Sequence, residues 1–147
     1  MIAFKELKDV LQKTVEWEKK LNDLYDVASF GLVKDDSKKL ITFLKDRQES
    51  NLEILEGIDV KSYGPSGWVR FAADYREDEL IPNKVITRES SPKQILDTIL
   101  EYGEKLRDFY KMISEHVVSE RQRDLFDSLS RFKEEQTNRI RNFARSG

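Results

Sequence analysis

Four stretches of the chain carry apolar residues that return every three or four positions. This spacing places the apolar residues on one face of a helix and predicts that the face is buried. Short connections within each pair of stretches predict two antiparallel helical hairpins, over about 3–57 and about 92–145. The segment of about 58–91 between them is long enough to be the crossover of a four-helix bundle. The pattern therefore predicts an all-α fold in a single domain over residues 1–147.

The first predicted hairpin has recognisable helix ends. Gly31 is a stop signal for the first helix, Asp35, Asp36 and Ser37 offer capping oxygens to the second, and Gly57 ends it. The predicted inner face of the first helix consists of Phe4, Leu7, Leu11, Thr14, Glu18, Leu21, Tyr25 and Ala28. That of the second helix consists of Leu40, Leu44, Gln48, Asn51 and Leu55.

The second predicted hairpin begins at Ser91, an N-cap residue, with Pro92 in the first helical position. A break near Val118 and Ser119 separates its two helices. The inner face of the third helix is predicted to be Ile95, Ile99, Gly103, Leu106, Tyr110 and Ile113. For the fourth helix it is Leu125, Leu129, Phe132, Glu135 or Gln136, Arg139 or Ile140, and Phe143.

The crossover contains aromatic residues. Trp68, Phe71, Ala72 and Tyr75 have helical spacing, which predicts a short helix lying on the bundle or in a subunit interface. An alternative is that Tyr63, Trp68, Phe71 and Tyr75 line a pocket for a small molecule or a peptide.

Composition excludes several classes of function. The chain has no cysteine, which removes thiol catalysis, iron–sulfur clusters and zinc ribbons. Its 26 basic and 28 acidic residues are interspersed, so we expect no nucleic-acid partner, and charged runs such as 131–135 are predicted to be mostly solvated helix faces. The N-terminus reaches charged residues within five positions and no run is long and apolar enough for a membrane span, which predicts a cytoplasmic protein without a membrane partner.

A polar or small residue interrupts each predicted inner face near its middle. The interruptions are Glu18 in the first helix, Gln48 with Asn51 in the second, Gly103 in the third, and Glu135 with Asn138 in the fourth. Buried polar groups are unfavourable unless they form hydrogen bonds or bind a metal. A buried carboxylate in particular takes up a proton or pairs with a cation. The interruptions therefore predict a polar layer across the bundle.

The first and third helices repeat a short motif, EKKLNDLY at 18–25 and GEKLRDFY at 103–110. With the hairpin–crossover–hairpin order, this motif resembles the ferritin-like superfamily, most closely small rubrerythrin-type proteins. The resemblance implies two irons held by a glutamate from each of helices one and three and a Glu-x-x-His from each of helices two and four. Carried onto this chain, Glu18 and Glu135 match, whereas Gln48, Asn51, Gly103 and Asn138 replace the other ligands.

A degenerate di-iron site of this kind predicts a protein without a bound metal or cofactor and without catalytic residues, so that an enzyme is the less favoured reading. The resemblance implies a structural or interaction module that forms a homodimer. The alternative is an iron-handling or oxidoreductase protein in which Glu18 and Glu135 hold iron or another divalent metal. His116 lies outside both motifs and is predicted to be exposed or to interact with the end of the third helix. Gly103 predicts either a close approach of a neighbouring helix or a larger facing side chain.

Overall fold

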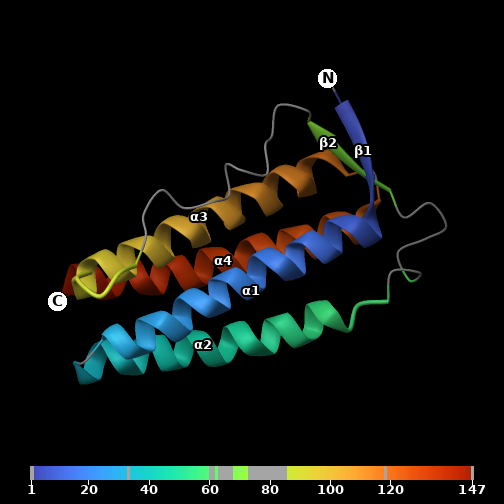
Figure 1. The fold of residues 1–147 in the computed structure, drawn as a ribbon. Helices are drawn as coiled ribbons and strands as arrows, with labels where there is room; N and C mark the ends of the chain where they lie inside the picture. Colours follow the sequence, from blue (N-terminus) through green and yellow to red (C-terminus); the bar gives the residue numbers. More distant parts are fainter. Residues whose placement is uncertain are drawn as a thin grey trace.

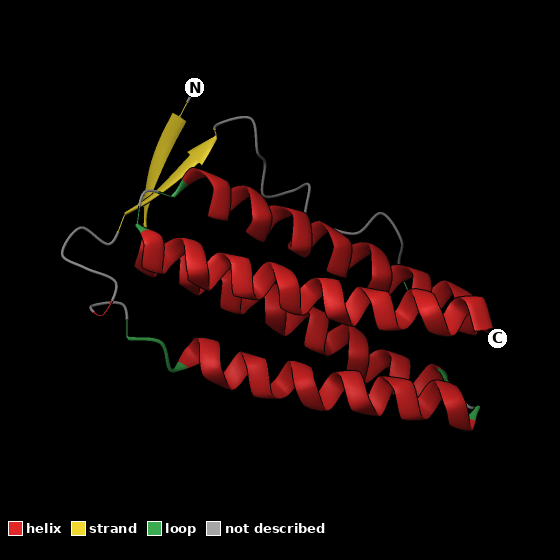
Figure 2. Cartoon of the chain, turned by 180° about the vertical axis from the view of Figure 1, so that it is seen from behind, coloured by secondary structure: helices red, strands yellow, loops and turns green. Residues whose placement is uncertain are grey.

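The computed structural model describes residues 2–32, 34–59, 62, 68–72, 86–117 and 119–146. Four long helices lie side by side (Figure 1), and their bounds are α1 Leu7–Gly31, α2 Asp35–Glu56, α3 Pro92–His116 and α4 Glu120–Ser146. The four helices predicted from the apolar spacing are therefore confirmed. Helices α1 and α2 run in opposite directions, as do α3 and α4, whereas α2 and α3 run in the same direction (Figures 1 and 2).

The predicted inner faces are confirmed over the lengths of α1 and α3, whereas Phe4, predicted on the first face, lies before α1 begins. Every predicted position from Leu7 to Ala28 on α1 and from Ile95 to Ile113 on α3 is buried. The edge-to-face pair of Trp17 and Phe109, with ring centroids 4.6 Å apart, connects the two helices. On α2 the predicted face is displaced at its beginning, where Ile41 is buried instead of Leu40.

The helix ends agree with the sequence signals in part. Ser91 forms the predicted N-cap of α3, because its hydroxyl accepts a hydrogen bond from the Gln94 amide at 3.1 Å while the Gln94 side chain accepts one from the Ser91 amide at 2.8 Å. The predicted capping of α2 is wrong, because Lys34 is the N-cap residue and forms no side-chain cap. Asp35 and Asp36 lie in the first turn, where their negative charges interact favourably with the positive end of the helix dipole.

Two short strands correct the prediction that the ordered structure is entirely helical. Strand β1 (Ile2–Glu6) pairs antiparallel with β2 (Trp68–Ala72), with Ile2 opposite Ala72 and Glu6 opposite Trp68 (Figure 2). The first helix therefore begins at Leu7 rather than near residue 3, and the predicted short helix through Trp68, Phe71 and Ala72 is wrong. Strand formation depends on a partner more than sixty positions away in the sequence, which local spacing cannot indicate. Tyr63 and Tyr75 lie outside the described residues.

On α4 the prediction is confirmed at Leu129 and at the alternatives Gln136 and Ile140, and the alternatives Glu135 and Arg139 are wrong. Glu135, Asn138 and Arg139 are exposed, and Leu125, Phe132 and Phe143 are only half-buried. The buried positions are Gln122, Phe126, Leu129, Ser130, Lys133, Gln136, Thr137 and Ile140. Lys133 thus points inward, where the sequence predicted a solvated charge. None of the helices over the described residues has the length and apolar character needed to cross a membrane.

Candidate functional site

A buried ion pair lies at the centre of the polar layer. Glu18, near the middle of α1, and Lys133, near the middle of α4, both have 0% side-chain exposure, and the Lys133 Nζ is in direct contact with Oε1 of Glu18. Predicting that a carboxylate on α1 enters the bundle was correct. The cation that it requires is supplied by a side chain of this same chain.

Glutamine and asparagine side chains surround the ion pair. Lys133 Nζ also donates to Oε1 of Gln48 at 2.8 Å and to Oε1 of Gln136 at 2.9 Å. Gln136 Nε2 donates to Gln48 Oε1 at 3.0 Å, and Gln48 Nε2 donates to the backbone carbonyl of Glu18 at 3.1 Å. Asn51 Nδ2 makes a longer contact of 3.4 Å with Glu18 Oε1. We call Glu18, Gln48, Asn51, Lys133 and Gln136 the polar layer; it joins α1, α2 and α4.

The geometry of the polar layer fits a protonated lysine. Three oxygens, one each from Glu18, Gln48 and Gln136, lie around the Lys133 Nζ, and only an ammonium group has three hydrogens to donate. Burial lowers the pKa of Lys133, and the charge and hydrogen bond of Glu18 act in the opposite direction. With both groups ionised, the polar layer carries no net charge.

Three of the predicted vestigial positions lie outside the layer, and two of them, Glu135 and Asn138, are on the surface. Glu135 is 45% exposed and forms ion pairs with Arg47 at 3.1 Å and with Arg139 at 3.6 Å. Asn138 is exposed and accepts a hydrogen bond from Arg141 at 2.6 Å. The prediction that Glu135 and Asn138 face the interior is therefore wrong. A metal site that combines Glu18 with Glu135 is not assembled, because one carboxylate is buried and the other lies on the surface.

Glu135 belongs instead to a surface cluster that covers the layer between α2 and α4. Arg47 lies 5.6 Å from the ring centroid of Phe43 and 5.7 Å from that of Phe132, and Arg139 lies 4.6 Å from that of Phe43. The Phe132 ring is also 5.1 Å from Lys133 Nζ. Cations over aromatic faces are favourable, so this cluster links α2 to α4 beside the ion pair.

Replacing Glu135 with glutamine is expected to change the free energy of unfolding by no more than about 1 kcal/mol, because exposed ion pairs contribute little. Urea unfolding followed by circular dichroism measures the change. A loss of several kcal/mol would show that Glu135 is part of the buried layer after all.

Gly103 lies where α3 and α4 approach each other closely. A Cβ atom added to Gly103 would be 2.9 Å from Cγ2 of Thr137, a distance that real Cβ contacts do not reach. Of the two alternatives predicted for this glycine, the facing side chain is confirmed, because Thr137 of α4 occupies the space next to it. A glutamate at the position that the resemblance assigned to a ligand would have to displace the Thr137 side chain.

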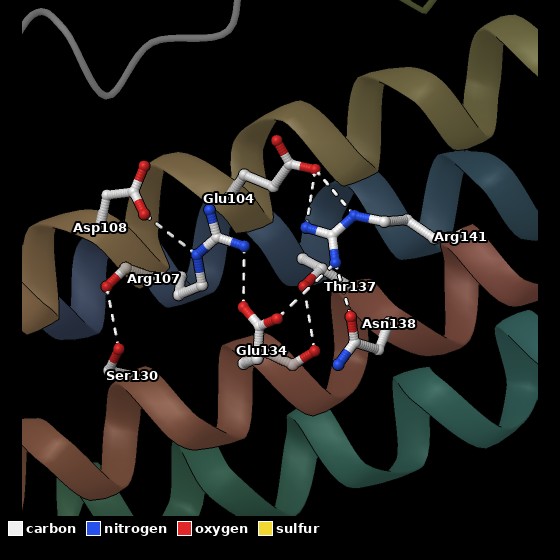
Figure 3. A network of polar contacts seen from close by, with 8 residues as sticks. All are labelled: Glu104, Arg107, Asp108, Ser130, Glu134, Thr137, Asn138 and Arg141. Atoms are coloured by element: carbon white, nitrogen blue, oxygen red, sulfur yellow. Dashed lines mark hydrogen bonds and ion pairs between the residues drawn. The ribbon is translucent and has the colours of Figure 1, made fainter.

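A network of charged side chains flanks this close approach on the outside (Figure 3). The Arg141 guanidinium on α4 donates through two nitrogens to Oε1 of Glu104 on α3, at 2.9 and 3.2 Å. Arg107 on α3 donates to Glu134 on α4 at 2.7 Å, and Ser130 donates to the Arg107 carbonyl at 3.1 Å. All of these contacts cross from one helix of the second hairpin to the other. The network stabilises the α3–α4 pairing and does not enter the polar layer.

Tyr25 lies on the same face of α1 as Glu18 and is buried. Burial, and to a smaller degree the negative charge of Glu18, raises the pKa of the Tyr25 hydroxyl above its ordinary value of 10.0. The folded state therefore keeps a proton that the unfolded state loses as the pH rises above this value. Stability contributed by Tyr25 is complete at neutral pH and decreases in alkaline solution.

We expect the free energy of unfolding to fall by up to about 1.4 kcal/mol for each pH unit above about pH 10 because of Tyr25. Replacement of Tyr25 with phenylalanine is expected to reduce this slope. Urea unfolding at about pH 9 and about pH 11 compares the two proteins. Equal slopes in the two proteins would contradict the assignment of this titration to Tyr25.

Other candidate ligands are not assembled into a site. His116, at the end of α3, donates from Nδ1 to the carbonyl of Met112 at 2.7 Å, and this contact agrees with the predicted interaction at the helix end. Within the described ranges, no three His, Cys, Asp or Glu side chains come together as a metal ion would require.

Sequence reasoning missed Lys133 as a member of the layer and named Gln136 only as an alternative to Glu135 on the inner face. A signal was present: Phe126, Leu129, Gln136 and Ile140 share a helical face with Lys133 at spacings of three and four. Lys133 was nevertheless predicted to be solvent-exposed, because buried lysines are rare.

Comparison with protein-family models, with curated proteins and with solved structures found no match for this chain. The geometry of the polar layer is therefore the basis for inferring function.

Proposed function

We propose that the chain is a ferritin-like protein of the rubrerythrin type in which an internal ammonium group has replaced the metal ions. It acts as a cytoplasmic, non-catalytic structural or interaction module and forms a homodimer. The observation that carries this proposal is the buried contact of Lys133 with Glu18, surrounded by the oxygens of Gln48 and Gln136. A carboxylate on α1 that matches an iron ligand of the resembled family here binds a cation that belongs to the protein.

Electrostatics explains why the layer disfavours a metal ion. A divalent cation near Glu18 would meet the positive charge of Lys133 at short range in a medium of low dielectric constant. The oxygens of Gln48 and Gln136 are already engaged by Lys133 Nζ, and neutral amide oxygens alone are weak ligands for iron and manganese. Metal binding would therefore require Lys133 to lose its proton or to leave the interior.

Metal analysis tests this proposal. Protein produced in medium supplemented with iron and manganese is expected to contain only traces of either metal after purification. Mn²⁺ is likewise expected to leave its melting temperature unchanged, because a ligand that does not bind the folded state does not stabilise it. Wild-type protein with a stoichiometric transition metal, whose removal lowers the melting temperature, would overturn the proposal.

A charge-reversed variant makes the test sharper. Lys133→Glu places a second carboxylate beside Glu18 and removes the ammonium, so we expect Mn²⁺ to raise the melting temperature of this variant. Glu135→Gln is the matched control, and Mn²⁺ is expected to affect it as little as the wild type. If Lys133→Glu does not fold, the metal content of the wild type still decides the question.

A further inference from the structure

Two buried oxygen atoms on α1 have no hydrogen-bond partner in the described part of the chain. They are Oε2 of Glu18 and Oδ1 of Asn22. The other carboxylate oxygen of Glu18 is fully used, since it contacts Lys133 and Asn51. Glu18 and Asn22 are separated by four positions and therefore lie one above the other on the same face of α1.

Unpaired buried acceptors are unfavourable, and native proteins rarely retain them without a water molecule or a ligand. Both oxygens accept hydrogen bonds, so a single partner that serves both brings two hydrogens or a positive charge. The polar layer is already neutral, because the charges of Glu18 and Lys133 balance each other. A cation at this place would add an uncompensated charge close to Lys133, which burial makes strongly unfavourable. A neutral molecule with two hydrogens fits these requirements.

We propose that one water molecule binds between Glu18 Oε2 and Asn22 Oδ1 and donates a hydrogen to each. This internal water is a constitutive part of the polar layer. Tyr25 lies three positions after Asn22 on the buried side of α1, and a phenolic hydroxyl is able to donate to the oxygen of a water molecule. The water satisfies the carboxylate oxygen that Lys133 does not reach. The water site rests on the proposed function, because it completes a polar layer that needs no metal.

A crystal structure at high resolution tests the proposal on the full-length protein. The expected result is an ordered solvent peak within hydrogen-bonding distance of Glu18 Oε2 and Asn22 Oδ1, lost in an Asn22→Leu variant. If Glu18 Oε2 instead receives a protein donor directly, the water site is wrong and the proposed function stands. A sodium ion, recognised by shorter contacts and more ligands than water has, also overturns the water site alone. A transition metal with an anomalous signal overturns both.

Thermal unfolding provides a second test whose sign distinguishes the outcomes. If the water is present, Asn22→Leu removes one of its two anchors and leaves Glu18 Oε2 unpaired, and we expect the melting temperature to fall by about 3 °C or more. Leucine is the better helix former, so without a bound water the same change is neutral or stabilising. The control is Gln12→Leu, at an exposed position of α1, which is expected to leave the melting temperature unchanged or slightly raised. A melting temperature of Asn22→Leu at or above that of the wild type contradicts the proposal.

Discussion

Replacement of Lys133 with methionine is expected to lower the free energy of unfolding by about 3–5 kcal/mol, the usual effect of removing one partner of a buried ion pair. Methionine fills much of the same volume, so the cavity is small and the loss comes mainly from the unpaired carboxylate of Glu18. Gln48 and Gln136 also lose the donor that both of their side-chain oxygens share. Urea unfolding at neutral pH, followed by circular dichroism, measures the effect.

A second substitution separates the ion pair from simple packing. In Glu18→Gln/Lys133→Met the unpaired charge is absent, and we expect this double variant to be more stable than Lys133→Met alone. Lys19→Met is the matched surface control, because Lys19 pairs with Glu56 at 3.8 Å and both side chains are at least half exposed. Its expected cost is below about 1 kcal/mol. If the double variant is less stable than Lys133→Met alone, the loss is caused by packing and the central ion pair has little energetic importance.

Gly103→Glu, which would restore the carboxylate that the resemblance assigns to this position, is expected to destabilise the protein by about 3–5 kcal/mol. The first added carbon already meets Thr137 Cγ2, and a carboxylate at this buried position would lose its hydration. Denaturant unfolding measures the loss. Stability within about 1 kcal/mol of the wild type would mean that α3 and α4 are further apart at this point than described.

Smaller substitutions identify the cause of this effect. Gly103→Ala gains about 1 kcal/mol of helix propensity but brings its methyl group against Thr137. Thr137→Ser removes Cγ2 and retains the hydroxyl that donates to the Glu134 carbonyl at 3.0 Å. We therefore expect Gly103→Ala/Thr137→Ser to be more stable than Gly103→Ala. Gly57→Ala is a control, because its added Cβ meets backbone oxygens only at ordinary distances of 3.5 and 3.7 Å.

The parts of the fold that are determined by residues close together in the sequence could be predicted. Apolar spacing and the signals at Gly31, Ser91 and Pro92 were sufficient for the four helices, because amphipathic faces and caps depend on neighbouring residues. The strands could not be predicted in the same way, since Ile2–Glu6 is stable as a strand only beside Trp68–Ala72.

The candidate site could be predicted in part. A polar interruption at Glu18 and at Gln48 was visible, because both lie on strongly apolar faces. On α4 the sequence offers two faces rotated by one residue, one through Phe132 and Glu135 and one through Leu129 and Lys133. The charge of Lys133 argued against burial of the second face, since an unpaired lysine is unfavourable in a core. Only the position of Glu18 across the bundle makes a buried lysine favourable, and that partner lies more than one hundred positions away in the sequence.

The central claim is that an ammonium group of the protein occupies the middle of the polar layer in place of a metal ion. A crystal structure of protein produced with excess iron and manganese, with diffraction data collected on both sides of the absorption edges of these metals, tests it most directly. The expected result is the Lys133 Nζ among Glu18, Gln48 and Gln136 and no anomalous peak between α1, α2 and α4. An anomalous peak beside Glu18, with Lys133 turned out of the interior, would contradict it.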